Sequence, residues 1–279
     1  MDNLTSILQD KQACLEDWFR ERKGSIVAFS GGIDSALVLF LAGKIQGKSN
    51  AIGVISHSES LKTKDFEQAK AFCRQFDISL EVIKTREIDD EQYRRNPQNR
   101  CFFCKQHLYR ELQAVKEKYP LFDVLNGTNY DDLGDYRPGL QAAANYQIQS
   151  PLVDCKVTKE DIRLLARYFG LPNWNKPASP CLSSRIPYHQ VITAEKLKQI
   201  EQAEDILNTL GFKDVRVRHY GASAQVEVPA DELPRLYSLS DTVAGQLKAI
   251  GFEHVRIDPE GLVSGKLNRS ITNPLDTTP

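Results

Sequence analysis

The chain has no excess charge of either sign, no long uninterrupted apolar run and few cysteines. Its 36 lysine and arginine residues balance 37 aspartate and glutamate residues, which excludes the positive overall field typical of non-specific nucleic-acid binding. No apolar run is long enough to cross a bilayer, and the N-terminus lacks the basic and apolar regions of a secretory signal. We therefore expect a cytoplasmic protein with a small-molecule substrate, no membrane partner and no nucleic-acid partner.

Six cysteines in 279 residues are too few for a disulfide scaffold, and cytosolic thiols stay reduced. Any clustered set therefore points to metal binding or catalysis. Cys14, Cys73 and Cys155 have no motif spacing and lie in amphipathic or loop contexts. We expect these three to be packing residues.

The order of apolar segments predicts an α/β fold. Hydrophobic residues make up 41% of the chain, enough for a sizeable core, and the length favours two domains. Strand-like runs alternate with helical patterns in the first part, which predicts a parallel sheet covered on both faces. The expected strands are 24–29, 51–56, 80–84 and 124–128, separated by helices 36–44, 62–76 and 103–118.

A proline-rich stretch at 171–187 separates this region from a different pattern. The order then becomes helix 194–210, strands 215–219 and 225–228, helix 231–250 and strand 254–258, which predicts a small α+β domain. We expect the first domain at 1–188 and the second, smaller domain at 189–279.

The first strand runs into Ser30-Gly31-Gly32-Ile33-Asp34-Ser35, which leads into a helix. A helix N-terminus offers unpaired backbone N–H groups and partial positive charge, so this turn predicts an anion site. The two glycines allow close approach to phosphate oxygens, the serine hydroxyls can donate hydrogen bonds, and Asp34 could hold Mg²⁺ or a water. The Gly-Lys-Ser/Thr ending of a Walker loop and the Gly-x-Gly-x-x-Gly dinucleotide fingerprint are both missing. A serine-capped turn without a ligand is the alternative.

This Ser-Gly-Gly-x-Asp-Ser motif resembles the signature of the PP-loop enzymes, which cleave ATP to AMP and pyrophosphate. The resemblance implies a doubly wound parallel sheet of five strands and an adenylated intermediate. It also implies that adenine lies near Ser56 and Gly127, at the carboxyl ends of two strands. The ATP contacts that it implies are Ala28, Ser30, Gly31, Gly32, Asp34, Ser35, Ser56, Gly127 and Arg137.

Cys101-Phe-Phe-Cys104 is a C-x-x-C motif, and Cys181 follows in Ser-Pro-Cys-Leu-Ser-Ser-Arg. Four thiolates would complete a structural metal site, whereas three leave one metal position open to another ligand. A [4Fe–4S] cluster held by three cysteines could thus carry hydrosulfide as a nucleophile. The alternatives are two packed thiols, a zinc site or a redox dithiol.

Three further stretches, 126–139, 173–188 and 215–218, resemble the LarE-type sulfur transferases of nickel-pincer nucleotide biosynthesis. The resemblance covers about 25–268 and implies that pyridinium-3,5-biscarboxylic acid mononucleotide is converted to a thiocarboxylate. One subclass sacrifices a single cysteine, and another carries three cysteines and a cluster, which Cys101 and Cys104 favour here. It also implies a homo-oligomer. His189 stands where the family usually has glycine, a difference that puts the local turn in question more than the chemistry. A lone histidine there could ligate metal or lie in a solvated loop.

Arg216 and Arg218 alternate with valines on one predicted strand, so both guanidinium groups face the same side and suit a phosphate. With Glu204 and Glu227, the resemblance implies a substrate-phosphate or metal site there. The alternative is a solvated strand face with ion pairs. Asp131, Asp132, Asp135 and Arg137 follow the strand that leads to Gly127, where they could contact substrate or cap the loop.

The expected reaction is attack of a substrate carboxylate on the α-phosphate of ATP, followed by displacement of AMP by cluster-bound sulfide. The site residues expected to carry it are Asp34, Cys101, Cys104 and Cys181. A tRNA uridine thiolase of the same superfamily is one alternative, but zinc-ribbon cysteine pairs and a basic net charge are absent. A non-catalytic regulator that binds zinc and a nucleotide is the other.

Overall fold

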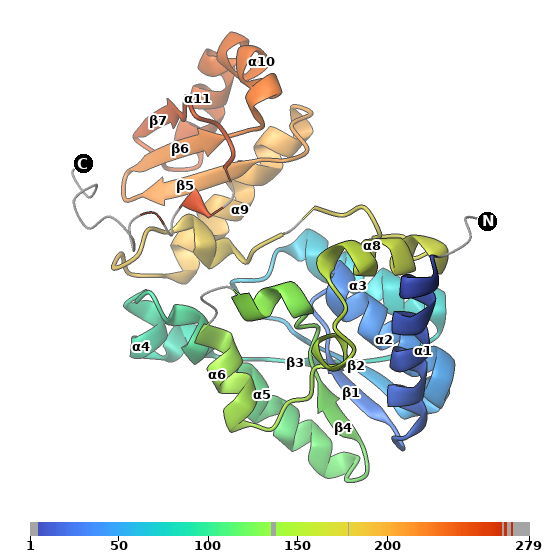
Figure 1. Cartoon of the computed structure of the whole chain (residues 1–279). Coiled ribbons are helices and arrows are strands. Elements are labelled where there is room, and N and C mark those ends of the chain that lie inside the picture. The colour runs from blue at the N-terminus through green and yellow to red at the C-terminus, as the bar shows by residue number, and fades with distance from the viewer. Residues whose placement is uncertain (1–4, 135–137, 178, 264, 267–268, 270–279) are drawn as a thin grey trace. The chain divides into compact units, whose positions relative to one another are not determined.

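A computed structural model describes residues 5–134, 138–177, 179–263, 265–266 and 269 (Figure 1). The chain divides into two compact units. Unit 1 comprises Met1–Glu87 and Cys101–Ser179, and unit 2 comprises Ile88–Arg100 and Pro180–Pro279. No helix within the described residues is long and apolar enough to span a membrane.

Unit 1 is built on a parallel sheet in the order β3-β2-β1-β4, which confirms the α/β class. Its strands are β1 (Ser25–Ala28), β2 (Ala51–Ser56), β3 (Ser79–Ile83) and β4 (Asp123–Leu125). The resemblance implied five strands, and the described residues form four. Gln149 makes only an isolated parallel bridge with Leu125, because Pro151 starts a helix two residues later and ends the extended chain.

Helices cover both faces of this sheet, as a doubly wound fold requires (Figure 1). Val27 packs into a core formed with α1 (Ser6–Arg20), α2 (Ile33–Gln46), α3 (Thr63–Phe76) and α8 (Lys159–Tyr168). The neighbouring Ile26 and Ala28 point to the other face and pack with α5 (Arg100–Lys118) and α6 (Pro138–Asn145). The apolar run of β1 is therefore buried on both sides, as its sequence predicts.

Unit 2 has its own sheet and core, which confirms a small α+β fold. Strand β5 (Arg216–Tyr220) pairs antiparallel with β6 (Ser223–Glu227), and β6 pairs parallel with β7 (His254–Ile257). The helices are α9 (Ala194–Thr209), α10 (Leu233–Ser238) and α11 (Ser240–Ala249). The single helix expected at 231–250 is thus divided at Leu239, whose backbone leaves helical geometry.

A short excursion of the chain at 88–100, which includes α4 (Glu91–Arg94), belongs to unit 2. The Tyr93 hydroxyl bonds to Ser183 Oγ at 2.5 Å, and Asn96 Nδ2 donates to the carbonyl of Pro187 at 2.7 Å. These contacts pack 180–188 against 88–100, and both segments belong to unit 2.

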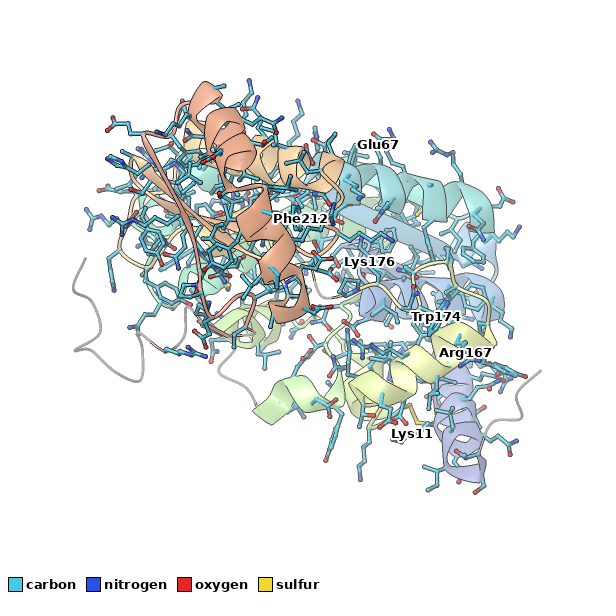
Figure 2. The ribbon with its side chains drawn as sticks, turned by 90° about the horizontal axis from the view of Figure 1, so that it is seen from above. Lys11, Glu67, Arg167, Trp174, Lys176 and Phe212 are labelled. Carbon is cyan, nitrogen blue, oxygen red and sulfur yellow. A yellow bond between two sulfur atoms is a disulfide. The ribbon has the colours of Figure 1, made fainter. Side chains whose placement is uncertain are left out.

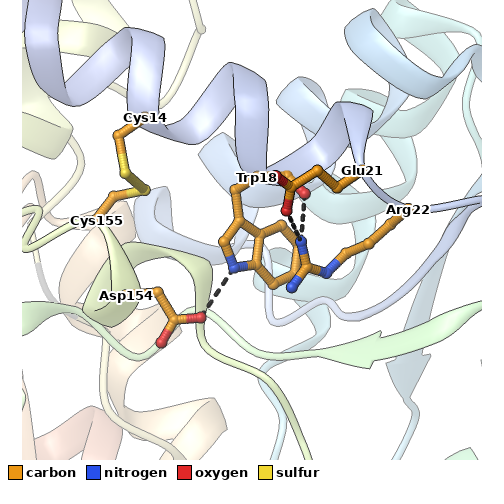
Figure 3. Close-up of a disulfide and its surroundings, with 6 residues drawn as sticks. All are labelled: Cys14, Trp18, Glu21, Arg22, Asp154 and Cys155. Carbon is orange, nitrogen blue, oxygen red and sulfur yellow. Dashed lines mark hydrogen bonds and ion pairs between the residues drawn. A yellow bond between two sulfur atoms is a disulfide. The ribbon is translucent and has the colours of Figure 1, made fainter.

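Cys14 and Cys155 form a disulfide within unit 1, which bridges 141 residues of sequence (Figure 3). The expectation that these two cysteines are separate packing residues is therefore wrong. Their pairing depends on α1 lying against α7 (Pro151–Asp154), a tertiary contact that cysteine spacing does not reveal. Cys73 is free and buried as expected, and burial raises the pKa of its thiol to about 12.

Candidate functional site

Hydrogen bonds of its own serines fix the backbone of the turn between β1 and α2. Ser35 Oγ accepts from the backbone N–H of Ser30 at 3.2 Å and donates to the carbonyl of Gly32 at 3.1 Å. Gly32 is the N-cap of α2, so no side chain at the N-cap accepts from the first N–H groups of the helix. The turn thus presents backbone N–H groups and the positive end of a helix of 14 residues, which is suited to bind phosphates.

Two glycines make this turn possible. Gly31 has φ of +73°, a left-handed conformation that a side chain would strain. Gly127, just beyond β4, lies so close to α2 that an added Cβ would stand 2.6 Å from the backbone nitrogen of Ser35. Gly127 is therefore required for the close approach of the β4 end to the nucleotide turn.

Asp34, in the first turn of α2, is held by Lys159 at the start of α8. The Lys159 ammonium lies 2.6 Å from Oδ1 and 2.7 Å from Oδ2 of Asp34. The Lys159 side chain is 34% exposed and the Asp34 side chain 25%. The pair places a cation beside the expected phosphate site. Lys159 was not among the residues expected from the sequence, although it directly follows the capping residue Thr158.

One cavity of about 390 Å³ in unit 1 brings several expected residues together. It is lined by the nucleotide turn, the end of β4 and the first turns of α5. Of the expected ATP contacts and thiols, it includes Ala28, Ser30, Asp34, Ser35, Gly127 and Cys101. Lys105 and Tyr109, one and two turns after Cys101 on α5, also line it. The i, i+4, i+8 spacing from Cys101 is the signal that could have identified both.

Asn126 lines the same cavity with an unsatisfied donor. Its Oδ1 accepts from the Thr128 N–H at 3.0 Å and from Ser150 Oγ at 2.8 Å, which fixes the orientation of the amide. Its Nδ2 is buried and makes no hydrogen bond among the described residues. A buried donor in this state costs free energy unless a ligand acceptor satisfies it, so Asn126 fits a polar ligand in the cavity.

Asp131 and Asp132 cap the loop after β4. Asp132 Oδ2 accepts from the Asn129 N–H at 3.1 Å, and Asp131 Oδ2 accepts from the Lys159 N–H at 2.8 Å. Asp132 also lines the cavity of about 390 Å³. Arg137 and Asp135, expected from the sequence, lie outside the described residues, and their roles stay predictions.

Three of the expected ATP contacts, Gly31, Gly32 and Ser56, do not line that cavity. The Ser56 hydroxyl, at the end of β2, bonds to Thr85 Oγ1 and does not line that cavity. Gly31 lines a second cavity of about 460 Å³, between α3 and the segment that carries Trp174 and Lys176. Figure 2 labels these two residues. The Lys176 ammonium lies 2.8 Å from Oδ1 of Asp65, and this ion pair links the segment to α3.

None of the three thiols expected to act together is part of a disulfide. Cys101 and Cys104 lie in the first turns of α5 in unit 1, where Cys101 is exposed and faces the nucleotide cavity. Cys181 is exposed in unit 2. Within the part of the chain that the structure describes, no group of three or more His, Cys, Asp or Glu side chains is placed to hold a metal ion. The shared site of the three thiols stays a prediction.

The backbone of Cys181 is held by a fully buried arginine. Arg185 Nη1 donates to the carbonyls of Pro180 at 2.7 Å and of Cys181 at 3.2 Å. The same guanidinium makes a two-point ion pair with Glu204, at 2.8 Å and 3.2 Å. Glu204 thus compensates the charge that fixes the Cys181 segment, and sequence reasoning gave Arg185 no role.

The expected phosphate pair, Arg216 and Arg218, differs in its surroundings. Arg218 is buried and makes a two-point ion pair with Glu227, at 3.1 Å and 2.9 Å. Arg216 is half-buried, and burial lowers its pKa, as do the neighbouring charges of Arg185 and Arg218. Arg218 and Glu227 therefore form an ion pair, as the alternative to a ligand site predicted. Roles of Arg216, Arg218, Glu204 and Glu227 in phosphate or metal binding stay predictions.

His189 occupies the turn where the resembling family usually has glycine. Its φ is +66°, the left-handed conformation that glycine adopts without strain. Its backbone N–H donates to the carbonyl of Asn96 at 2.9 Å. His189 thus adopts a backbone conformation that glycine would take readily at this position.

Comparisons with known proteins agree with this geometry. The family model of NAD synthase matches residues 7–107, which include the nucleotide turn. The chain is 39% identical over 270 residues to an uncharacterized protein of Synechocystis sp., covering 95% of this chain and 100% of that protein. It is 32% identical over 246 residues to an uncharacterized protein of Methanocaldococcus jannaschii, covering 88% and 93%.

A third relative has a named activity. The chain is 33% identical over 265 residues to the pyridinium-3,5-bisthiocarboxylic acid mononucleotide synthase of Lactiplantibacillus plantarum, covering 95% of this chain and 96% of that protein. The similarity spans both units and includes the nucleotide turn and the arginine-rich strand β5. The chain belongs to the pyridinium-3,5-bisthiocarboxylic acid mononucleotide synthase (LarE) family, within the PP-loop superfamily.

Proposed function

We propose that the protein is an ATP-dependent sulfur transferase that converts a carboxylate of a pyridinium mononucleotide into a thiocarboxylate. The observation that carries the proposal is the single cavity shared by the nucleotide turn and the free thiol of Cys101. The named relative supports the acceptor class, because it is a synthase of a pyridinium bisthiocarboxylic acid mononucleotide. We extend the proposal to pyridinium-3,5-biscarboxylic acid mononucleotide as the acceptor.

ATP binds with its phosphates on the turn at 30–35. Backbone N–H groups at the start of α2 and the Lys159 ammonium balance the phosphate charge, and Asp34 can hold Mg²⁺ together with phosphate oxygens. An acceptor carboxylate then attacks the α-phosphorus, and pyrophosphate leaves. The fixed donors stabilise the negative charge that develops on the phosphates without having to reorganise. Asn126 Nδ2 supplies a further donor in this cavity.

The thiols of Cys101, Cys104 and Cys181 are the proposed ligands of a [4Fe–4S] cluster. The first two fit such a role because neither is in a disulfide and they lie three residues apart on one helix, with Cys101 exposed at the nucleotide cavity. When bound, the cluster would supply the sulfide that replaces AMP. Arg185 serves Cys181 by fixing the carbonyls of Pro180 and Cys181.

The acceptor phosphate is proposed to bind near β5. The lowered pKa of Arg216 records burial and the proximity of two other guanidinium groups, whose mutual repulsion an anion would relieve. Arg218 keeps its ion pair with Glu227 and adds a second positive charge beside the proposed phosphate site. Homo-oligomerisation stays a prediction from the family resemblance.

The test is pyrophosphate release by anaerobically purified protein with ATP and Mg²⁺, in the presence and absence of the carboxylated pyridinium nucleotide. We expect release that depends on the nucleotide, with thiocarboxylate formed in mass spectra. No nucleotide-dependent release would remove the proposal of acceptor adenylation.

Iron and sulfide analysis tests the cluster separately. We expect Cys101→Ala, Cys104→Ala and Cys181→Ala each to lose bound iron, while each keeps ATP binding. The matched control is Cys73→Ala, whose thiol is buried in the core of unit 1 and should leave the iron content unchanged. Wild-type protein without iron and sulfide, but with nucleotide-dependent pyrophosphate release, would reject the cluster and retain the adenylation step.

A further inference from the structure

The disulfide between Cys14 and Cys155 is one of four links made by α1 and by the residues just after its end. Lys11, Cys14, Trp18 and Arg22 follow one another at helical spacing of three, four and four residues. Lys11 pairs with Asp161, Trp18 Nε1 donates to Asp154 Oδ2 at 2.9 Å, and Arg22 Nε donates to Gln149 Oε1 at 3.2 Å. Figure 3 shows the disulfide beside the Trp18–Asp154 hydrogen bond.

The partners of these links form one short stretch of chain, 149–161, which leads to the nucleotide turn. Four residues after Cys155, Lys159 makes its ion pair with both oxygens of Asp34. Between them, the Val157 carbonyl accepts from the Tyr130 N–H at 2.9 Å, and the Lys159 N–H donates to Asp131 Oδ2 at 2.8 Å. The disulfide therefore anchors to α1 the segment that places Lys159 at Asp34.

The two sulfurs differ in access. Cys14 is exposed on α1, whereas Cys155 is 5% exposed and lies in the core of unit 1. An external thiolate can therefore reach the sulfur of Cys14, while the sulfur of Cys155 is the natural leaving group. The three non-covalent links do not depend on the sulfur–sulfur bond, so we expect the fold to survive reduction while the segment around Cys155 gains freedom.

We propose that Cys14 and Cys155 form a reversible thiol–disulfide exchange site, opened by a dithiol reductant, and that its state sets the affinity of the nucleotide turn for ATP. One thiolate of the dithiol bonds to Cys14 Sγ, the bond between Cys14 and Cys155 breaks, and Cys155 Sγ takes the electron pair and a proton. The second thiolate displaces Cys14, which is protonated in turn. The dithiol is oxidised and the protein disulfide is reduced by two electrons.

The oxidised form binds ATP more tightly, because Lys159 is already ordered beside the phosphate site and less freedom is lost on binding. The change in affinity is roughly fivefold, at the lower end of couplings measured between distinct sites. This second step rests on the proposed ATP function, whereas the exchange chemistry does not.

Differential alkylation of the full-length protein tests the exchange. Free thiols are blocked, the protein is then reduced and labelled with a second reagent, and peptides that contain Cys14 and Cys155 are followed by mass spectrometry. We expect Cys14 and Cys155 to resist the first reagent before the native protein is treated with dithiothreitol, and to react with it afterwards. The disulfide should form again on oxidation. Two open thiols in the untreated protein, or a bond that native-state dithiothreitol leaves closed, would overturn the exchange site.

Calorimetric titration with ATP tests the coupling. Reduced wild-type protein and Cys14→Ala should both bind roughly fivefold more weakly than the oxidised protein, and the variant should not respond to dithiothreitol. Lys11→Met is the matched control, since it removes a neighbouring non-covalent link and should keep the response. Equal affinities in both redox states would overturn the coupling. Absence of ATP binding in either state would overturn the proposed function instead, and the labelling result would stand by itself.

Discussion

Lys159 is the side chain on which nucleotide binding should depend most directly. Its ammonium contacts both oxygens of Asp34, so Lys159→Met removes the cation that pairs with the carboxylate of the nucleotide turn. We expect the Kd for ATP to rise roughly tenfold, equivalent to about 1.4 kcal/mol. The free energy of unfolding should change by less than about 1 kcal/mol, because the pair is partly exposed and screened by water.

Titration calorimetry and urea unfolding measure these two quantities. Lys48→Met is the control, because Lys48 also pairs with an aspartate, Asp77, but on the exposed surface. Unchanged ATP affinity in Lys159→Met would show that this cation does not serve the phosphates.

His219, a residue with no expected role, gives unit 2 a dependence on pH. Burial is the main reason why its pKa falls from 6.5 to about 4, and the positive charge of Lys196 adds to it. Protonation therefore favours the unfolded chain. Stability should be constant above about pH 6.5 and should decline as the pH falls towards 4, by up to about 3 kcal/mol.

Urea unfolding between pH 4 and 8 measures this decline. His219→Gln keeps a donor for Gln199, which the His219 Nε2 now contacts at 2.9 Å, but cannot be protonated in this range. The variant should lose most of the decline between pH 6.5 and pH 4. A curve parallel to that of the wild type would assign the acid sensitivity to other groups.

At the scale of elements, the start of α8 couples stability to nucleotide binding. Thr158 and Asp161 form a capping box, in which Thr158 Oγ1 accepts from the Asp161 N–H and the carboxylate accepts from the Thr158 N–H. Thr158→Ala should lower the free energy of unfolding by about 1 kcal/mol. It should also weaken ATP binding, since Lys159 is the first residue of the helix.

A second helix provides the matched control. Thr193 caps α9 in unit 2 by accepting from the Lys196 N–H at 3.3 Å. Thr193→Ala should cost a similar amount of stability, about 1 kcal/mol, without affecting ATP affinity. If both variants bind ATP equally well, the helix cap and the nucleotide turn are independent.

The elements that could be predicted from the sequence are those with strong local signals. The apolar run of β1 and the glycines of the turn each fix nearby backbone, and both are found as expected. The isolated bridge at Gln149 and the link between Cys14 and Cys155 depend on partners distant in the chain. No local pattern encodes those partners, so periodicity and spacing could not supply them.

The same distinction applies to the candidate site. Ser30, Asp34, Gly127 and Cys101 could be predicted, because motif residues at strand ends and helix starts gather at one sheet edge. The ion pair of Lys159 with Asp34 and the burial of Arg218 against Glu227 could not. Both depend on charges brought together by tertiary packing.

At the scale of the whole molecule, each unit has its own apolar core, and the tryptophans report on only one of them. The chain has 2 tryptophans, Trp18 and Trp174, and both lie in unit 1. Tryptophan fluorescence therefore follows the unfolding of unit 1, while far-UV circular dichroism follows the helices and strands of both units. The two signals together can separate a change in one unit from a change in the other.

Glu204→Ala uses this separation. The substitution leaves Arg185 buried without its carboxylate partner, and the loss of one member of a buried pair costs about 3–5 kcal/mol. The circular-dichroism transition of unit 2 should move to lower urea concentration. The free energy of unfolding of unit 1, followed by tryptophan fluorescence, should stay within about 0.5 kcal/mol of the wild-type value. Lys198→Ala, an exposed change on the same helix, should move neither signal. An equal shift of both signals in Glu204→Ala would show that the two cores unfold as one cooperative structure, because damage confined to the Arg185 pair would then be transmitted to unit 1.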